Sequence, residues 1–145
     1  MQIQRSVTVQ RPIERVFAYL SDFTTTTDWD PGTIRTTLER GDGSVGTTYR
    51  NVSSFAGRQT ELTYRVVELS PAHRFALRGE NKTVVAHDTM EFTSIPRGTT
   101  VTYTADFSFK GFARLVAPLL RPALTKLGDE AERGMREALL RLESS

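Results

Sequence analysis

Apolar and polar residues alternate in different ways along the chain, and each pattern predicts a different element. Residues 3–9 have apolar side chains at every second position, apart from Arg5, which predicts a half-buried strand. Ile13, Val16, Phe17 and Leu20 then follow at helical spacing, which predicts a short helix over about 12–20 with Pro12 in its first turn. Residues 24–27 are all threonine, too β-branched for a good helix, so a broken helical turn or loop is expected.

Residues 33–109 predict six consecutive strands separated by turns. The turn signals are the glycine-rich, proline-containing or asparagine-containing steps at residues 41–43, 56–57, 70–71, 81–82 and 95–98. No repeat and no linker divides the chain, so we expect a single domain over residues 1–145.

Two hairpin registers indicate which side chains share one face. Closing the last turn with Ser94 and Thr99 places Phe92 opposite Val101. Closing the preceding turn with Glu80 and Thr83 places Ala86 opposite Leu77 and Asp88 opposite Phe75. Both registers, with a turn closed by Leu69 and Ala72, predict the same apolar face: Leu62, Tyr64, Val66, Phe75, Leu77, Val84, Ala86, Met90, Phe92, Val101, Tyr103, Ala105, Phe107 and Phe109. The face of the sheet on which Tyr49 lies depends on the turn at residues 56–57, because moving that turn by one residue places Tyr49 on the opposite face.

After Gly111 the pattern becomes helical. One apolar stripe is expected to pack against the sheet: Phe112, Val116, Leu119, Ala123, Leu127, Ala131, Met135, Ala138 and Leu142. Pro118 and Pro122 should kink or break its first part, and a clean helix should follow them to Leu142. Gly128 and Gly134 each cost about 1 kcal/mol relative to alanine in a helix, which indicates a close approach or needed space at these positions.

Composition excludes several classes of protein. The 145 residues are 38% hydrophobic and 25% charged, with a net charge of +2 and arginines that form no run, so we expect no nucleic-acid partner. Cysteine is absent, and neither histidine has neighbours at metal-ligand spacing, so no metal and no cofactor is assigned. His87 should face solvent and His73 a sheet edge. With no signal pattern and no long apolar run, we expect a cytoplasmic protein without stable membrane insertion, of unknown oligomeric state.

Asp88 is the strongest candidate for chemistry, because the register places a carboxylate on the apolar face. Such a group must find a partner, reach water or bind its proton more tightly. The functional interpretation is an acid in a cavity that hydrogen-bonds a ligand or acts as a general base. The alternatives are a bulge that turns it outward or structural pairing with Arg5, and we favour these. Arg5 itself either binds a ligand anion or packs its stem while its head reaches the rim.

Aromatic residues with polar tips are the other candidates. Tyr49, Tyr64 and Tyr103 either orient a ligand or serve as plain core aromatics. Trp29 either caps a cavity or wedges a helix against the sheet.

The order of the elements, together with residues 29–32 (Trp-Asp-Pro-Gly) and 43–49 (Gly-Ser-Val-Gly-Thr-Thr-Tyr), resembles the START-like (SRPBCC) superfamily in its polyketide cyclase/dehydrase and lipid-transport branch. The resemblance implies an α+β helix-grip fold, in which a curved antiparallel seven-stranded sheet (β-α-α-β6-α) wraps around a long C-terminal helix and leaves a ligand pocket. The ligand-binding residues expected from register and resemblance together are Arg5, Trp29, Tyr49, Tyr64, Leu77, Asp88, Met90, Phe92, Tyr103, Phe107, Val116, Leu119, Ala123 and Leu127.

Three functions are compatible with this sequence. The leading hypothesis is binding of a small hydrophobic or amphipathic ligand, such as a lipid or polyketide, between sheet and helix. The second is an enzyme of the polyketide cyclase/dehydratase type that uses Asp88, Arg5 and a tyrosine. The third is a protein-interaction module with a vestigial cavity.

Overall fold

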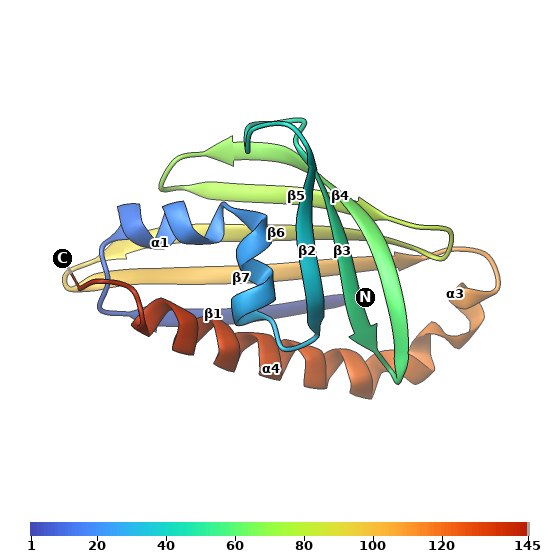
Figure 1. Cartoon of the computed structure of the whole chain (residues 1–145). Coiled ribbons are helices and arrows are strands. Elements are labelled where there is room, and N and C mark those ends of the chain that lie inside the picture. Colours follow the sequence, from blue (N-terminus) through green and yellow to red (C-terminus); the bar gives the residue numbers. More distant parts are fainter. Residues whose placement is uncertain (145) are drawn as a thin grey trace.

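The computed structural model describes residues 1–144 and has an α+β fold in which one sheet curves around a long helix (Figure 1). The strands are β1 (Gln2–Val9), β2 (Thr33–Arg40), β3 (Thr48–Phe55), β4 (Arg58–Ser70), β5 (Arg74–Glu80), β6 (Val84–Ile95) and β7 (Gly98–Phe109). The helices are α1 (Ile13–Leu20), η1 (Phe23–Thr25), α2 (Thr26–Trp29), α3 (Ala113–Val116), η2 (Ala117–Leu120) and α4 (Arg121–Leu140).

All seven strands form one antiparallel sheet in the order β1-β7-β6-β5-β4-β3-β2. Strands β2 to β7 are joined as consecutive hairpins, while β1 crosses to pair with β7 at the opposite edge. Figure 1 shows α4 running beside β1 along the length of the long strands, while β2 to β4 cross in front of β6 and β7. The predicted helix-grip fold is therefore confirmed.

The segment between β1 and β2 follows the predicted pattern closely. Helix α1 begins one residue after Pro12, and it buries Val16, Phe17 and Leu20. The threonine run forms the expected broken helical turn, as η1 followed by α2. Asp22 starts this turn by accepting hydrogen bonds from the backbone N–H and hydroxyl of Thr24, which satisfies a donor at the helix end.

The predicted registers are confirmed for one hairpin and wrong for two others. Phe92 lies opposite Val101, as expected. Between β5 and β6, however, Asp88 lies opposite Leu77, because the side chain of Asn81 accepts hydrogen bonds from the backbone N–H groups of Thr83 and Val84 and moves the turn.

The β4–β5 hairpin differs as well. Ser70 pairs with Arg74 across a longer turn in which Ala72 has a positive φ of 62°, and a bulge follows between Val66 and Glu68. In both wrong hairpins the central pairings, such as Val66 with Leu77, differ from the prediction by two positions, so the side chains of the predicted apolar face keep that face. Beyond the bulge, at residues 68–70, the difference is three positions.

The inner face of the sheet, which faces α4, holds most of the core. Of the predicted apolar face, ten members are buried: Leu62, Tyr64, Val66, Phe75, Leu77, Ala86, Met90, Phe92, Val101 and Ala105. Tyr49 joins them, because Ala56 and Gly57 form a two-residue turn with positive φ at both positions and this sets Tyr49 opposite Tyr64. Phe17 packs edge-on against Phe92 with ring centroids 4.9 Å apart.

The predicted stripe after Gly111 is wrong in its first part. Phe112, Val116 and Leu119 are exposed, because the 3-10 turn η2 and the two prolines interrupt the helical phase. Helix α4 restarts the phase and ends at Leu140 rather than Leu142. Its buried residues are Leu124, Gly128, Ala131, Met135, Ala138 and Leu139.

Two glycines allow α4 to approach its neighbours closely, as their cost in a helix had indicated. A Cβ at Gly134 would lie 1.9 Å from the carbonyl oxygen of Trp29, and one at Gly128 would lie 2.5 Å from Cγ2 of Ile3. Helix α4 therefore approaches the backbone of α2 at Gly134 and packs directly against side chains of β1 at Gly128. None of the helices within residues 1–144 is long and apolar enough to cross a membrane.

Candidate functional site

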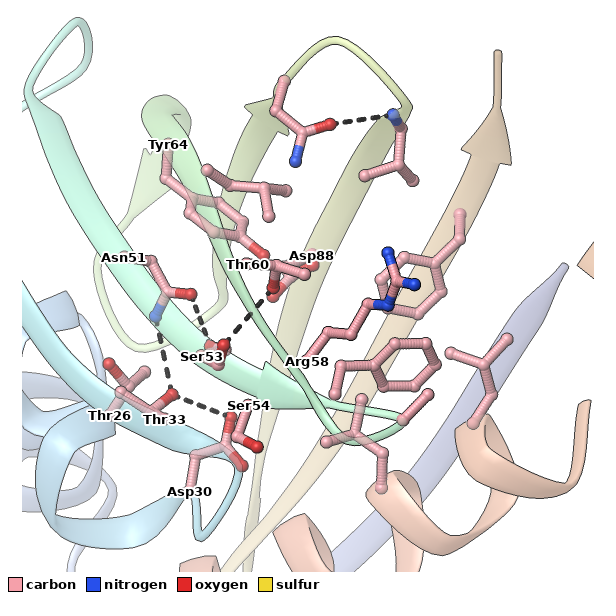
Figure 2. A pocket seen from close by; sticks show the side chains of 18 of the residues that line it. Thr26, Asp30, Thr33, Asn51, Ser53, Ser54, Arg58, Thr60, Tyr64 and Asp88 are labelled. Carbon is pink, nitrogen blue, oxygen red and sulfur yellow. Dashed lines mark hydrogen bonds between the residues drawn. The ribbon is translucent and has the colours of Figure 1, made fainter. Parts of the chain in front are cut away.

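A cavity of about 360 Å³ lies between the inner face of the sheet and the N-terminal half of α4 (Figure 2). Ligand pockets have volumes of roughly 300–1,000 Å³, so this cavity is large enough for a small organic molecule. Exposed lining residues mark its mouth: Ser54, Ala56, Arg58 and Thr83, from the β3–β4 hairpin and the β5–β6 turn. A protein with a vestigial cavity would have an interior filled by side chains, whereas this fold contains an open cavity.

One wall of the cavity is apolar. It is formed by side chains of strands β3, β4, β6 and β7 together with the segment from α3 to α4, namely Phe55, Leu62, Val84, Phe107, Phe109, Ala113, Leu120, Leu124 and Leu127. These side chains expose apolar surface to the cavity, and a ligand that covers this surface gains about 25 cal/mol for each Å² removed from water.

The opposite wall is polar and is built around α2 and strand β3. Asn51 donates to the hydroxyls of Thr33 and Thr36, while its amide oxygen accepts from Ser53 at 2.7 Å (Figure 2). Asp30 accepts from the backbone N–H of Gly32 and the hydroxyl of Thr33, at 3.0 and 3.1 Å. Burial raises the pKa of Asp30 above its ordinary value despite these hydrogen bonds.

Asp88 lies in the cavity and is 4% exposed. Its Oδ2 accepts a hydrogen bond from the Tyr103 hydroxyl at 2.9 Å, while Oδ1 is buried without a partner among residues 1–144. Burial raises the pKa of Asp88 to about 7; the hydrogen bond from Tyr103 opposes this rise and the nearby charge of Asp30 adds to it. The carboxyl group therefore changes between its protonated and ionised forms near neutral pH.

The favoured structural interpretations of Asp88 are both wrong. No bulge turns it outward, since β6 and β7 keep a continuous register through its pairing with Ala105. Arg5 is not its partner: it donates to Asp129 at 2.9 Å and to the backbone carbonyl of Thr125 at 3.3 Å. Arg5 does not line the cavity, because the missing side chain at Gly128 lets its guanidinium cross α4 instead.

Tyr64 and Tyr103 bring hydroxyl groups into the cavity beside Asp88. The ring of Tyr64 packs over the backbone of Gly79 on the next strand, where a Cβ would lie 2.6 Å from Cε1 of the ring. Burial raises the pKa of both phenols well above the ordinary value, with Asp88 contributing in each case. Both tyrosines therefore remain neutral hydrogen-bond donors at physiological pH.

Trp29 also lines the cavity, at the end of α2, with 2% of its surface exposed. Its ring meets that of Tyr103 edge-on, with centroids 5.9 Å apart, and its Nε1–H is buried without a partner within residues 1–144. Trp29 thus has a buried donor and Asp88 a buried carboxyl oxygen without partners among residues 1–144, and both residues contact Tyr103. Buried polar groups are rarely left unpaired, so these two are suited to a ligand or to water.

The other predicted site residues divide into three groups. Phe107 and Leu127 line the cavity, as predicted. Tyr49, Leu77, Met90 and Phe92 are buried in the core and are not among the residues that line the cavity. Val116, Leu119 and Ala123 are also absent from the lining, because the interrupted helical phase turns them away. Tyr49 lies instead on a separate, more open depression shared with Asp22 and Leu38.

Several lining residues were missed. Asn51 and Ser53 follow Tyr49 at every second position, so the alternation that assigned Tyr49 also places them on the inner face. Nothing in the sequence indicated that Arg58 lines the cavity, apart from its position directly after the turn at Gly57. Leu120 and Leu124 became lining residues only through the break in the helix.

No group of three or more His, Cys, Asp or Glu side chains within residues 1–144 is arranged to hold a metal ion. Both histidines are exposed, which confirms the prediction that His87 faces solvent. The titratable side chains that line the cavity are Asp30, Arg58, Tyr64, Asp88 and Tyr103.

Comparison with known proteins places these features in a family. The profile of the family described as polyketide cyclase/dehydrase and lipid transport matches residues 1–144. A search of curated proteins finds no match to this sequence.

Several solved structures are similar over nearly their whole length. The Zhui aromatase/cyclase of a Streptomyces species has a TM-score of 0.83 and 17% identity, covering 97% of this chain and 94% of that one. A Thermus thermophilus protein has a TM-score of 0.81 and 16% identity, with 97% of each chain covered. A START superfamily protein of Mycobacterium smegmatis has a TM-score of 0.77 and 14% identity, covering 98% and 99% of the two chains. At these identities the likeness establishes the fold alone.

Proposed function

The chain belongs to the polyketide cyclase/dehydrase and lipid transport family, and from this we propose that it binds a small apolar or amphipathic molecule in the cavity. The observation that carries the proposal is the cavity of about 360 Å³, with one apolar wall and a few polar groups that converge from the other. Binding sites for small organic molecules share this design, because apolar area provides affinity and the polar groups set orientation.

The polar groups define the chemistry of the ligand. A hydroxyl or enol group at its inner end would accept from the Trp29 Nε1–H and donate to the unpartnered oxygen of Asp88. A carbonyl group would accept from the Trp29 Nε1–H and from the protonated form of Asp88. Its body would lie against the apolar wall near Phe107 and Leu124. Arg58 is exposed at the mouth, where it would meet an anionic outer end. A hydroxylated aromatic, a polyketide chain or a fatty acid fits this description.

Two adjacent leucines provide a matched test. Leu120 lines the cavity, whereas Leu119 is 79% exposed on the outside. We expect 1-naphthol and decanoic acid to bind the unmodified protein in isothermal titration calorimetry and native mass spectrometry. Leu120→Trp should weaken binding at least tenfold by filling the cavity, while Leu119→Trp should leave it within twofold. Equal effects of the two variants would contradict binding in the cavity.

A second candidate function is cyclisation of a poly-β-keto chain, and Asp88 is the observation that favours it. A carboxyl group with a pKa of about 7 beside a neutral tyrosine is suited to remove a proton from the carbon next to a carbonyl group. The resulting enolate carbon would attack a second carbonyl of the same chain, whose oxygen then takes up a proton.

Product analysis separates this enzyme from a binding protein. Turnover of a poly-β-keto thioester, followed by chromatography, should fall about a hundredfold or more in Asp88→Asn if Asp88 is a general base. Affinity should change little, because asparagine keeps the shape and the neutral charge of the protonated acid. Saturable binding without any cyclised product would contradict the enzyme hypothesis and support the binding function.

A further inference from the structure

The segment between β7 and α4 has an apolar outer surface that nothing in the described part of the chain covers. Phe112 is 78% exposed, Leu115 73% and Leu119 79%, and Val116 is exposed beside them. Their spacing of three and four residues places them along one side of the short helices α3 and η2. We refer to these four side chains as the outer patch.

The inner side of the same segment is apolar as well. Ala113 and Leu120 line the cavity, and Ala117 is buried. A helical segment with apolar side chains on both its outer and its inner side is unusual at a protein surface. Here the segment projects at one end of the molecule, beyond the ends of β6 and β7 (Figure 1). An exposed apolar patch of this kind typically marks an interaction surface.

The charge of the surrounding residues identifies the partner as anionic. Residues 110–127 contain four basic side chains, Lys110, Arg114, Arg121 and Lys126, and no acidic one. Lys110 pairs with Glu80 and Lys126 with Glu130. Arg114 and Arg121 form no ion pair with any other described residue, and both are exposed.

We propose that the outer patch docks on the surface of an anionic lipid bilayer. Phenylalanine and leucine side chains that project from a helical segment flanked by arginines are the features of helices that lie in the bilayer interface. The patch projects outward instead of forming a groove, so it fits a deformable lipid surface better than the convex surface of a folded partner. The two unpaired arginines, Arg114 within the segment and Arg121 directly after it, would add electrostatic attraction to an anionic surface.

Docking in this way would place the cavity mouth near the lipid, since the mouth residue Thr83 accepts a backbone hydrogen bond from Lys110, just before the segment that carries the patch. An apolar ligand would then have a short path between bilayer and cavity. The proposal does not depend on ligand binding, because vesicle binding is measured with no ligand added.

Vesicle flotation tests the proposal directly. We expect the protein to float with vesicles of phosphatidylcholine and phosphatidylglycerol at 7:3, and at least tenfold less with phosphatidylcholine alone. The triple variant Phe112→Ser, Leu115→Ser, Leu119→Ser should bind the anionic vesicles at least tenfold more weakly. The control variant Ile34→Ser, Leu38→Ser, Val45→Ser removes exposed apolar side chains elsewhere and should stay within twofold of the unmodified protein.

A second measurement keeps the test independent of folding. In Leu119→Trp, brominated lipids in the anionic vesicles should quench the new tryptophan, whereas Leu38→Trp should not be quenched. Arg114→Ser with Arg121→Ser should reduce binding and its dependence on salt. Absence of flotation with anionic vesicles would overturn the proposal and direct attention to an acidic protein partner. Equal binding by the triple variant, or equal quenching at Leu119 and Leu38, would overturn it as well.

Discussion

Replacing Asp88 by asparagine should make the protein more stable at neutral and alkaline pH and should change its stability little in acid. Burial raises the pKa of this carboxyl group from its ordinary value of 3.8 to about 7. The folded protein therefore binds the proton more tightly than the unfolded chain does. Ionisation of Asp88 opposes folding, and the asparagine variant has no charge to bury.

The magnitude follows from the difference between the two pKa values. Below pH 4 the carboxyl group is protonated in both states, so its burial carries no ionisation penalty. Between pH 4 and pH 7 the folded state holds one extra proton, and stability should fall by about 1.4 kcal/mol for each pH unit. Above pH 7 the penalty is complete, at about 4 kcal/mol.

Urea unfolding between pH 4 and pH 8.5 measures this effect. The free energy of unfolding of Asp88→Asn, minus that of the unmodified protein, should rise with pH up to about pH 7 and then level off. Asp106→Asn is the matched control, since Asp106 directly follows Ala105 on the neighbouring strand β7 and is exposed on the outer face of the sheet. This control should not reproduce the rise with pH.

A constant difference between Asp88→Asn and the unmodified protein across this pH range would refute the reasoning. It would mean that the Asp88 carboxylate is solvated in the folded protein. Carbon-detected NMR titration of the Asp88 carboxyl group provides the independent check, with an expected midpoint near pH 7.

Three further substitutions test the polar contact of Asp88, the close approach of α4 and the packing of the core. Tyr103→Phe removes the hydrogen bond that favours the ionised acid, so the NMR midpoint of Asp88 should move to higher pH; a fall would contradict the assigned contact. Gly134→Ala should destabilise the protein by about 3 kcal/mol in urea unfolding, because its Cβ would meet the Trp29 carbonyl, and a neutral effect would argue against this close approach. Phe92→Ala should lower the free energy of unfolding by about 3–5 kcal/mol while ligand affinity stays within a few fold, since Phe92 packs in the core outside the cavity; selective loss of affinity would contradict that placement.

Much of the fold could be predicted because alternation determines which face a strand residue occupies. The β6–β7 register was predictable from a two-residue turn at Pro96 and Arg97. The turn at Asn81 was not, because a side chain that bonds to the backbone can move a turn without changing the apolar pattern. The face of Asp88 was still correct, since an error of two residues preserves alternation.

The helical pattern failed where prolines interrupt it. A period of 3.6 residues predicts a face only while the helix is continuous, and η2 resets the phase between Pro118 and Pro122. Leu119 therefore faces outward and Leu120 faces the cavity, the reverse of the prediction for Leu119.

The candidate site could be predicted only in part, for a different reason. Alternation places both Met90 and Asp88 on the inner face, but it does not report whether the space beside each is filled. That depends on the curvature of the sheet and on the distance to α4, which Gly128 and Gly134 set through contacts remote in sequence.

The central claim is that the cavity beside Asp88 holds an apolar molecule, and intermolecular NOEs measured by NMR with 1-naphthol test it most directly. We expect saturable binding, with NOEs from the naphthol ring to the side chains of Phe107 and Leu124, and loss of both in Leu120→Trp. Absence of saturable binding, or NOEs confined to exposed side chains such as Phe112, would contradict the account.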